Sequence, residues 1–121
     1  MAKILLIEDM PANRALATKL LQADGHDVLS ADTAAGGMAL ARQALPDLVL
    51  LDLGLPDMDG WQALSELRRA NGAVARLRIV AFTAHAMVGD RDRAIAAGFD
   101  GYLSKPIDFA TFADTVGGLL P

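Results

Sequence analysis

Hydrophobic residues follow two alternating patterns along this chain: short continuous runs, and longer stretches in which they recur every three or four positions. Continuous runs are typical of strands, and the longer spacing is typical of amphipathic helices. One run, Leu48–Leu51, is apolar at every position, as expected for a central strand buried on both faces. The alternation predicts an α/β fold with helices on both faces of a parallel sheet. The expected strands are Lys3–Ile7, Asp27–Ala31, Leu48–Leu51, Ile79–Phe82 and Tyr102–Ser104.

Five helices are expected between and after these strands. The first begins at Pro11, where a missing N–H costs nothing, and ends before Gly25. The last takes Asp108 as its N-cap. The fourth, from about Met87 to Ala97, is poorest in large hydrophobic residues, so we expect it to be lightly anchored. The residues expected to face inward from the other helices are Leu16, Leu20 and Leu21; Ala34, Met38, Ala41 and Leu45; Trp61, Leu64 and Leu67; and Phe109, Phe112, Val116 and Leu119.

The composition narrows the class of protein. With 121 residues, of which 53% are hydrophobic, the chain fits one compact domain spanning residues 1–121. The absence of cysteine excludes disulfides and thiolate zinc sites. The two histidines, His26 and His85, lie too far apart in the sequence to suggest a metal centre, and we expect His26 on the surface.

The charge and the apolar runs exclude two kinds of partner. A net charge of −4 and a pI near 4.9 provide no basic field, so we expect no nucleic-acid binding. No apolar run has the length or flanks of a signal peptide or a transmembrane helix. We therefore expect a cytoplasmic protein with no membrane insertion.

Polar residues stand where four of the expected strands end: Glu8 and Asp9, then Asp52, Thr83 and Lys105. Right-handed crossovers place the carboxyl ends of parallel strands on one edge of the sheet, where such folds bind ligands. Three carboxylates gathered there repel one another unless one is protonated or a cation binds. Mg²⁺ prefers such oxygen ligands, so the sequence predicts a magnesium site. The alternative is that Glu8 and Asp9 only cap the first helix.

The chemistry expected at this edge is phosphoryl transfer. The chain contains neither GxGxxG nor GxxxxGK[ST], which disfavours a dinucleotide or P-loop site. Asp52 can act as a nucleophile on phosphorus and form an acyl phosphate. Lys105 can neutralise phosphoryl oxygens or form an ion pair with Asp9 or Asp52, and its bond to Pro106 can be cis. Thr83 offers a hydroxyl group to a phosphoryl oxygen.

The polar residues at the strand ends belong to four short motifs, which are Ile7-Glu8-Asp9, Leu50-Leu51-Asp52-Leu53-Gly54-Leu55-Pro56 with Met58-Asp59-Gly60, Phe82-Thr83-Ala84 and Leu103-Ser104-Lys105-Pro106. Together these motifs resemble the receiver domain of two-component response regulators, over essentially the whole chain. The resemblance implies a flavodoxin-like fold, with a doubly wound, five-stranded parallel sheet in the order 2-1-3-4-5. It also implies a phosphoacceptor that catalyses only its own phosphorylation and dephosphorylation, and is otherwise not an enzyme.

The resemblance implies a role for each residue of the pocket. Asp52 would take a phosphoryl group from a phosphohistidine on a histidine kinase or a histidine phosphotransfer protein. Asp9, Asp52 and the backbone carbonyl of Gly54 would ligate Mg²⁺, while Glu8 would act through a water molecule. Lys105 would pair with the phosphoryl group.

The resemblance also implies a switch. Thr83 would move toward the phosphoryl group and Tyr102 would turn inward, which would alter a surface made by the fourth helix, fifth strand and fifth helix. A downstream protein target would bind that surface. A purely amphipathic surface role for Tyr102 stays open. Gly54 and His85 occupy positions that tune the phosphoryl lifetime in the family, and Met10 replaces an asparagine found in relatives.

Two alternatives remain beside the phosphorylation switch. A receiver-fold scaffold would bind its partner whether or not Asp52 is intact. A Mg²⁺-dependent aspartyl phosphohydrolase normally needs a second acid two residues after the nucleophile, to act on the leaving group, but this chain has Gly54 there. Met1 directly before the first strand favours a stand-alone regulator, whereas the ending Gly117-Gly118-Leu119-Leu120-Pro121 leaves a receiver cut from a hybrid kinase open.

Overall fold

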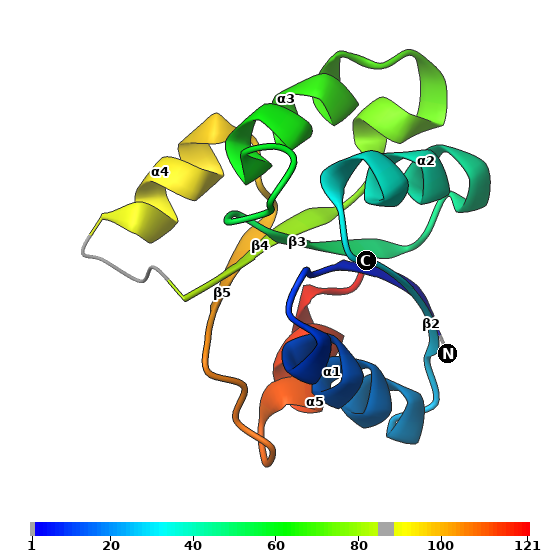
Figure 1. The fold of residues 1–121 in the computed structure, drawn as a ribbon, viewed down its shortest axis with the longest axis vertical. Helices are drawn as coiled ribbons and strands as arrows, with labels where there is room; N and C mark the ends of the chain where they lie inside the picture. Colours follow the sequence, from blue (N-terminus) through cyan, green and yellow to red (C-terminus); the bar gives the residue numbers. More distant parts are fainter. Residues whose placement is uncertain (1, 85–88) are drawn as a thin grey trace.

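The computed structural model of the chain describes residues 2–84 and 89–121. Its five strands form one parallel sheet in the order β2-β1-β3-β4-β5, as expected (Figure 1). Three strands run one residue longer than the sequence predicts, because β3 and β4 include Asp52 and Thr83 and β5 begins at Gly101. The strands are β1 (Lys3–Ile7), β2 (Asp27–Ala31), β3 (Leu48–Asp52), β4 (Ile79–Thr83) and β5 (Gly101–Ser104).

Helices cover both faces of this sheet. In Figure 1, α1 and α5 lie on one face, while α2, α3 and α4 lie on the other. A short 3₁₀ helix, η1 (Gly72–Arg76), connects α3 to β4. The arrangement confirms the doubly wound α/β fold. The helices are α1 (Pro11–Ala23), α2 (Ala34–Ala44), α3 (Gly60–Arg69), α4 (Asp90–Ala97) and α5 (Phe112–Leu119).

The alternation of side chains along the central strands builds two separate cores. In β1, Leu5 and Ile7 pack toward α2 and α3, whereas Ile4 and Leu6 pack toward α1 and α5. Every residue of β3 is buried, as the continuous apolar run predicts. Because both faces of β1, β3 and β4 are covered, the ends of these strands are held by packing on both sides.

The inward faces of α1 and α2 differ in part from the expected ones. In α1 the buried residues are Ala17 and Leu21, while Leu16 is only half-buried. Leu45 does not belong to α2: it ends the helix in the left-handed conformation, with φ 46°, and is exposed. The chain turns away from the helix at Leu45, so the helical spacing of apolar residues in the sequence runs one residue past the end of α2.

The start of α5 is a correction. The sequence places the N-cap at Asp108 and turns Phe109 inward, but α5 begins at Phe112 after the N-cap Thr111. Asp108 does accept the N–H of Ala110, at 3.0 Å, but this bond closes a separate turn. The turn rotates Phe109 outward, where it is 71% exposed, and the inward face consists of Phe112, Val116 and the half-buried Leu119.

The burial of α4 agrees with the sequence, whereas the burial of His26 does not. Met87 and His85 lie outside the described residues; in α4, only Ala94 is buried, which agrees with the shortage of large hydrophobic residues. The surface position expected for His26 is wrong, because its side chain is only 8% exposed and its Nδ1 accepts the N–H of Ala2 at 3.2 Å. None of the described helices has the length and hydropathy needed to cross a membrane.

Candidate functional site

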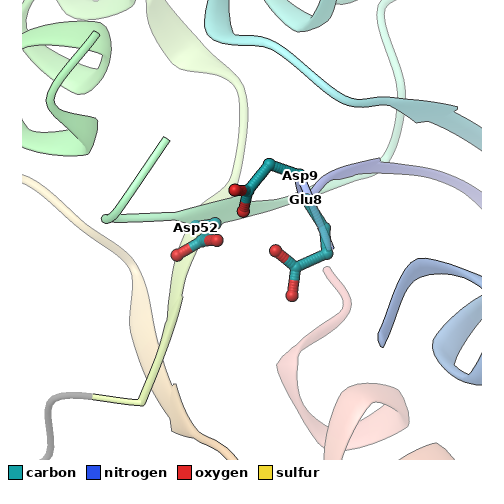
Figure 2. A group of neighbouring side chains, drawn as sticks. All are labelled: Glu8, Asp9 and Asp52. Atoms are coloured by element: carbon teal, nitrogen blue, oxygen red, sulfur yellow. The ribbon is translucent and has the colours of Figure 1, made fainter. Parts of the chain in front are cut away.

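The residues expected to converge do meet at the carboxyl edge of the sheet. Glu8 and Asp9 follow β1, and Asp52 is the last residue of the neighbouring strand β3. One carboxylate oxygen from each of the three lies within 4.8 Å of the others. Figure 2 shows the three side chains gathered where these two strands end. The parallel pairing of β1 with β3 therefore brings Asp52 into one cluster with Glu8 and Asp9, which are distant from it in the sequence.

Lys105, which follows the edge strand β5, reaches into this cluster. Its Nζ lies 2.5 Å from Glu8 Oε1 and 3.3 Å from Asp52 Oδ2. The same ammonium lies 5.0 Å from the centre of the Phe82 ring. The Lys105–Pro106 peptide bond is cis, as the sequence allows. The ion pair expected with Asp9 or Asp52 is thus made with Asp52, and Glu8 is a second partner.

Burial and charge act differently on the two buried acids. The side chain of Glu8 is fully buried, and this burial, with the neighbouring Asp52 carboxyl group, raises the pKa of Glu8 to about 7 against the opposing effect of Lys105. Burial also acts to raise the pKa of Asp52, but Glu8, the N–H of Gly54 and Lys105 together hold it below its usual value. Asp52 is therefore the ionised acid of the pair near neutral pH.

Both oxygens of Asp52 have defined surroundings. Oδ1 accepts the N–H of Gly54 at 3.0 Å, and Oδ2 faces Lys105. Asp52 and Thr83, both buried, line a hollow of about 180 Å³ beside the cluster. The full lining is Asp9, Met10, Asp52, Gly54, Thr83, Ala84 and Lys105. Asp52 thus combines a fixed geometry with access to a small ligand.

The donor set of the pocket fits a hard divalent cation. The three clustered acids offer only oxygen ligands, and Gly54 lines the same hollow. Glu8 Oε2 is buried and accepts no hydrogen bond from the described residues, which is costly for a charged group without a cation or a proton. These observations fit Mg²⁺ better than a softer metal, which would favour sulfur or imidazole ligands.

The capping alternative for Glu8 and Asp9 is wrong. The N-cap of α1 is Met10, no side chain among the described residues caps the helix, and its first turn holds no acid. Arg14 in α1 instead donates to the backbone carbonyls of Glu8, at 2.9 Å, and Asp9, at 3.4 Å. The side chains of the two acids are therefore left for the pocket.

Tyr102 lies on β5, which is separated by β4 from the strand that carries Asp52. It is half-buried against the core on the α3 side, and burial together with the Asp90 carboxylate raises its pKa. Its Cα pairs in register with Ala81, two residues before Thr83. Trp61, expected to be a packing residue, does pack: its ring contacts Phe99 edge to face, and the guanidinium of Arg93 lies 4.6 Å above it.

Two residues that hold the loops around the site could not be found from the sequence. Asp57, in the loop between β3 and α3, accepts hydrogen bonds from the N–H groups of Ala34 and Ala35 at the start of α2. Arg14 holds the turn that carries the two acids. Both side chains form hydrogen bonds with backbone groups, and such contacts have no signature in residue type or spacing.

The fold and the site define a class of protein. From β1 the chain adds β2 on one side of the sheet and then β3, β4 and β5 on the other, so the topology switches between β1 and β3. The acidic cluster lies at this switch point. The chain is thus a flavodoxin-like α/β protein whose ligand site lies at the topological switch point.

Comparisons with known proteins give the family. The model of the response regulator receiver domain matches residues 4–116, and the chain belongs to this family. It is 33% identical to protein PilH of Pseudomonas aeruginosa, over 99% of this chain and 98% of that protein. It is 42% identical, over 87% of its length, to sensor histidine kinase AruS of the same organism, but spans only 11% of that protein. The structure of the chemotaxis response regulator CheY4 of Vibrio cholerae covers 99% of both chains, with a TM-score of 0.90 and 26% identity.

Proposed function

We propose that Asp52 is the phosphoacceptor of this receiver domain and that its donor is a phosphohistidine. The observation that carries the proposal is the state of the Asp52 carboxylate: ionised, with one oxygen held by Gly54 and the other facing Lys105, beside an open hollow. An oxygen of Asp52 forms the new bond to phosphorus as the phosphorus–nitrogen bond of the donor breaks. The electron pair of that bond stays on the imidazole, which leaves as the neutral ring once it has a proton.

Four residues would hold Mg²⁺ in this pocket: Asp9, Asp52 and the backbone carbonyl of Gly54 directly, and Glu8 through a water molecule. Their support is the cluster of carboxylate oxygens within 4.8 Å and the position of Gly54 in the lining of the hollow. When bound, the cation neutralises the negative charge that the phosphoryl group brings.

Lys105 and Thr83 would receive the phosphoryl group from the other side. The ammonium of Lys105 already lies 3.3 Å from Asp52 Oδ2, so it can pair with a phosphoryl oxygen after a small displacement. Thr83 ends β4 and lines the hollow, from which its hydroxyl can donate to another phosphoryl oxygen.

The output surface would be made by α4, β5 and α5, with Tyr102 as the residue that reports the state of Thr83. A hollow of about 360 Å³ lies on this surface, and its lining includes Arg91, Tyr102 and Thr111. We propose that a downstream protein binds this hollow. We also propose that the chain forms one receiver domain over residues 1–121 and acts in the cytoplasm. The receiver would act on no substrate beyond its own Asp52.

The similarity to a sensor histidine kinase supports the proposed donor class, because the chain matches a segment of AruS. Within that relative, a receiver-like segment and a kinase belong to one protein. We therefore propose a histidine kinase or a histidine phosphotransfer protein as the direct partner of this chain.

The test is the intact mass after incubation with acetyl phosphate, with and without Mg²⁺. We expect a gain of one phosphoryl group that needs Mg²⁺ and is lost in Asp52→Asn. The matched control is Asp32→Asn, which changes an exposed carboxylate that follows β2 at the same edge of the sheet and should leave labelling intact. Labelling that persists in Asp52→Asn would contradict the assignment. Unlabelled wild type that still binds its partner would favour the scaffold, and steady release of phosphate with many turnovers would favour the hydrolase.

A further inference from the structure

The loop between β3 and α3 is attached to a helix that contributes no residue to the proposed pocket. Asp57 lies near the middle of this loop, and its two carboxylate oxygens accept separate hydrogen bonds from α2. Oδ1 accepts the N–H of Ala34 at 2.8 Å, and Oδ2 accepts the N–H of Ala35 at 3.0 Å. One side chain therefore joins the loop to the first turn of α2.

The contact is favourable in itself. The first N–H groups of a helix have no partner within the helix, and a carboxylate there also interacts well with the helix dipole. These two N–H groups hold the pKa of Asp57 below its usual value. The Asp57 residue is exposed, so burial does not force its side chain against the helix. The hydrogen bonds themselves fix it there.

The same loop is closed upon itself on the side of the pocket. Gly54 and Asp59 form an isolated antiparallel bridge, and the N–H of Gly60 donates to the carbonyl of Leu53 at 3.1 Å. Leu55 is buried in the core beneath α2 and α3. Asp57 and Gly54 thus belong to one loop closed by backbone contacts, and the N–H of Gly54 donates to Asp52 Oδ1.

We propose that Asp57 is a positioning residue, which clamps the β3–α3 loop to α2 and so keeps Gly54 in place for Mg²⁺ binding and phosphoryl acceptance. The inference rests on the proposed function, because it concerns the same pocket. Asp57 touches neither the metal nor the phosphoryl group, and it acts through the loop. If it serves only as a cap, its loss weakens α2 and leaves the pocket unchanged.

The chain offers a matched control at the same helix end. Thr33 is the N-cap of α2, and its hydroxyl accepts the N–H of Gly36 at 3.1 Å. Thr33→Ala removes one acceptor from the start of α2 without touching the loop, whereas Asp57→Ala removes the acceptors that belong to the loop. A comparison of the two variants separates the capping of a helix from the positioning of the pocket.

The experiment measures the Mg²⁺ dissociation constant by calorimetry and the labelling rate with acetyl phosphate in the full chain. We expect Asp57→Ala to weaken Mg²⁺ binding by about tenfold, the scale of an outer partner that orients a metal ligand, and to slow labelling. Thr33→Ala should lower the melting temperature but leave the dissociation constant within about twofold of wild type. Asp57→Asn, which keeps one carbonyl acceptor, should fall between wild type and Asp57→Ala, and it serves if Asp57→Ala does not fold.

The outcomes separate the two proposals. Equal Mg²⁺ affinity and equal labelling in wild type, Asp57→Asn and Asp57→Ala would overturn the positioning role and leave the proposed function standing. Equal losses in Thr33→Ala and Asp57→Ala would also overturn it, since capping alone would then explain them. If wild type itself neither binds Mg²⁺ nor gains a phosphoryl group, the proposed function fails, and the positioning role fails with it.

Discussion

Glu8 is the residue in which burial and charge oppose each other most directly. Without a cation, the pKa of Glu8 is about 7, well above the ordinary value of 4.5. Between these two values the folded chain keeps a proton on Glu8 that the unfolded chain has lost. The free energy of unfolding should therefore fall as pH rises from about 5 to about 8. Urea denaturation in the presence of a chelator, at a series of pH values, measures this slope.

The control for this slope is Glu8→Gln, which should flatten it. Asp52 does not interfere, because its pKa lies below the usual 3.8 and its contribution is lost only as pH falls through that lower range. A slope that is unchanged in Glu8→Gln would show that another group is responsible.

Lys105 provides the second prediction at this scale. Lys105→Met keeps the length of the side chain but leaves Glu8 and Asp52 without their ammonium. Because Glu8 can take up a proton, the loss in the free energy of unfolding should be moderate, about 1–3 kcal/mol at pH 8 without metal. Urea denaturation measures the loss, and Lys19→Met, at an exposed position of α1, is the control. A loss no larger than that of the control would contradict a stabilising role for the ion pairs.

At the scale of elements, the packing of α2 on β1 depends on a glycine. A Cβ placed on Gly37 would lie 2.5 Å from Ile7 Cγ1 and 2.9 Å from Ile7 Cγ2, and Ile7 is fully buried and cannot move aside. Gly37→Ala should therefore destabilise the fold by about 1–3 kcal/mol, the cost of an overpacked core.

Gly117→Ala in α5 is the matched control. Its Cβ would meet nothing within 4 Å, so alanine should stabilise this helix by about 0.5–1 kcal/mol. Denaturation midpoints of the two variants give opposite signs if the contact with Ile7 decides the effect. A stabilising Gly37→Ala would contradict the close approach.

The existence of the elements followed from the sequence far better than their ends and contacts did. The continuous apolar run Leu48–Leu51 indicated a buried strand, and its end placed Asp52 correctly. The start of α5 did not follow, because Asp108 forms a turn that resembles a cap, and periodicity alone cannot show that Phe109 points outward.

The site shows the same division. Glu8, Asp9 and Asp52 could be placed together because parallel strands put their carboxyl ends on one edge. The attachment of Asp57 to α2 could not be predicted, since it joins an exposed side chain to backbone N–H groups of any residue type. The burial of His26 depends on a contact with Ala2, which is distant in the sequence.

At the scale of the whole molecule, Mg²⁺ should stabilise the fold through mass action. A ligand that binds only the folded chain adds about 2.7 kcal/mol to the free energy of unfolding at about 100 times its dissociation constant. The melting temperature should therefore rise with Mg²⁺ concentration, and more steeply at pH 8 than at pH 6, because the proton on Glu8 competes with the cation.

Asp9→Asn is the control for this effect. It removes one carboxylate from the cluster, and so should abolish most of the rise with Mg²⁺. Less charge repulsion should make the metal-free variant at least as stable as wild type. Differential scanning calorimetry measures both effects, and a rise that survives in Asp9→Asn would place the cation elsewhere.

The strand order has a consequence for how this domain can diversify. Glu8 and Asp9, Asp52 and Thr83 stand at the ends of β1, β3 and β4, the three interior strands, while Tyr102 belongs to the edge strand β5. Most residues of the proposed phosphoacceptor pocket are thus held by interior strands, whereas Lys105 follows the edge strand β5, which also carries the proposed output residue Tyr102. Substitutions around Tyr102 can therefore change which downstream protein is bound while the acidic residues of the phosphoacceptor pocket stay the same.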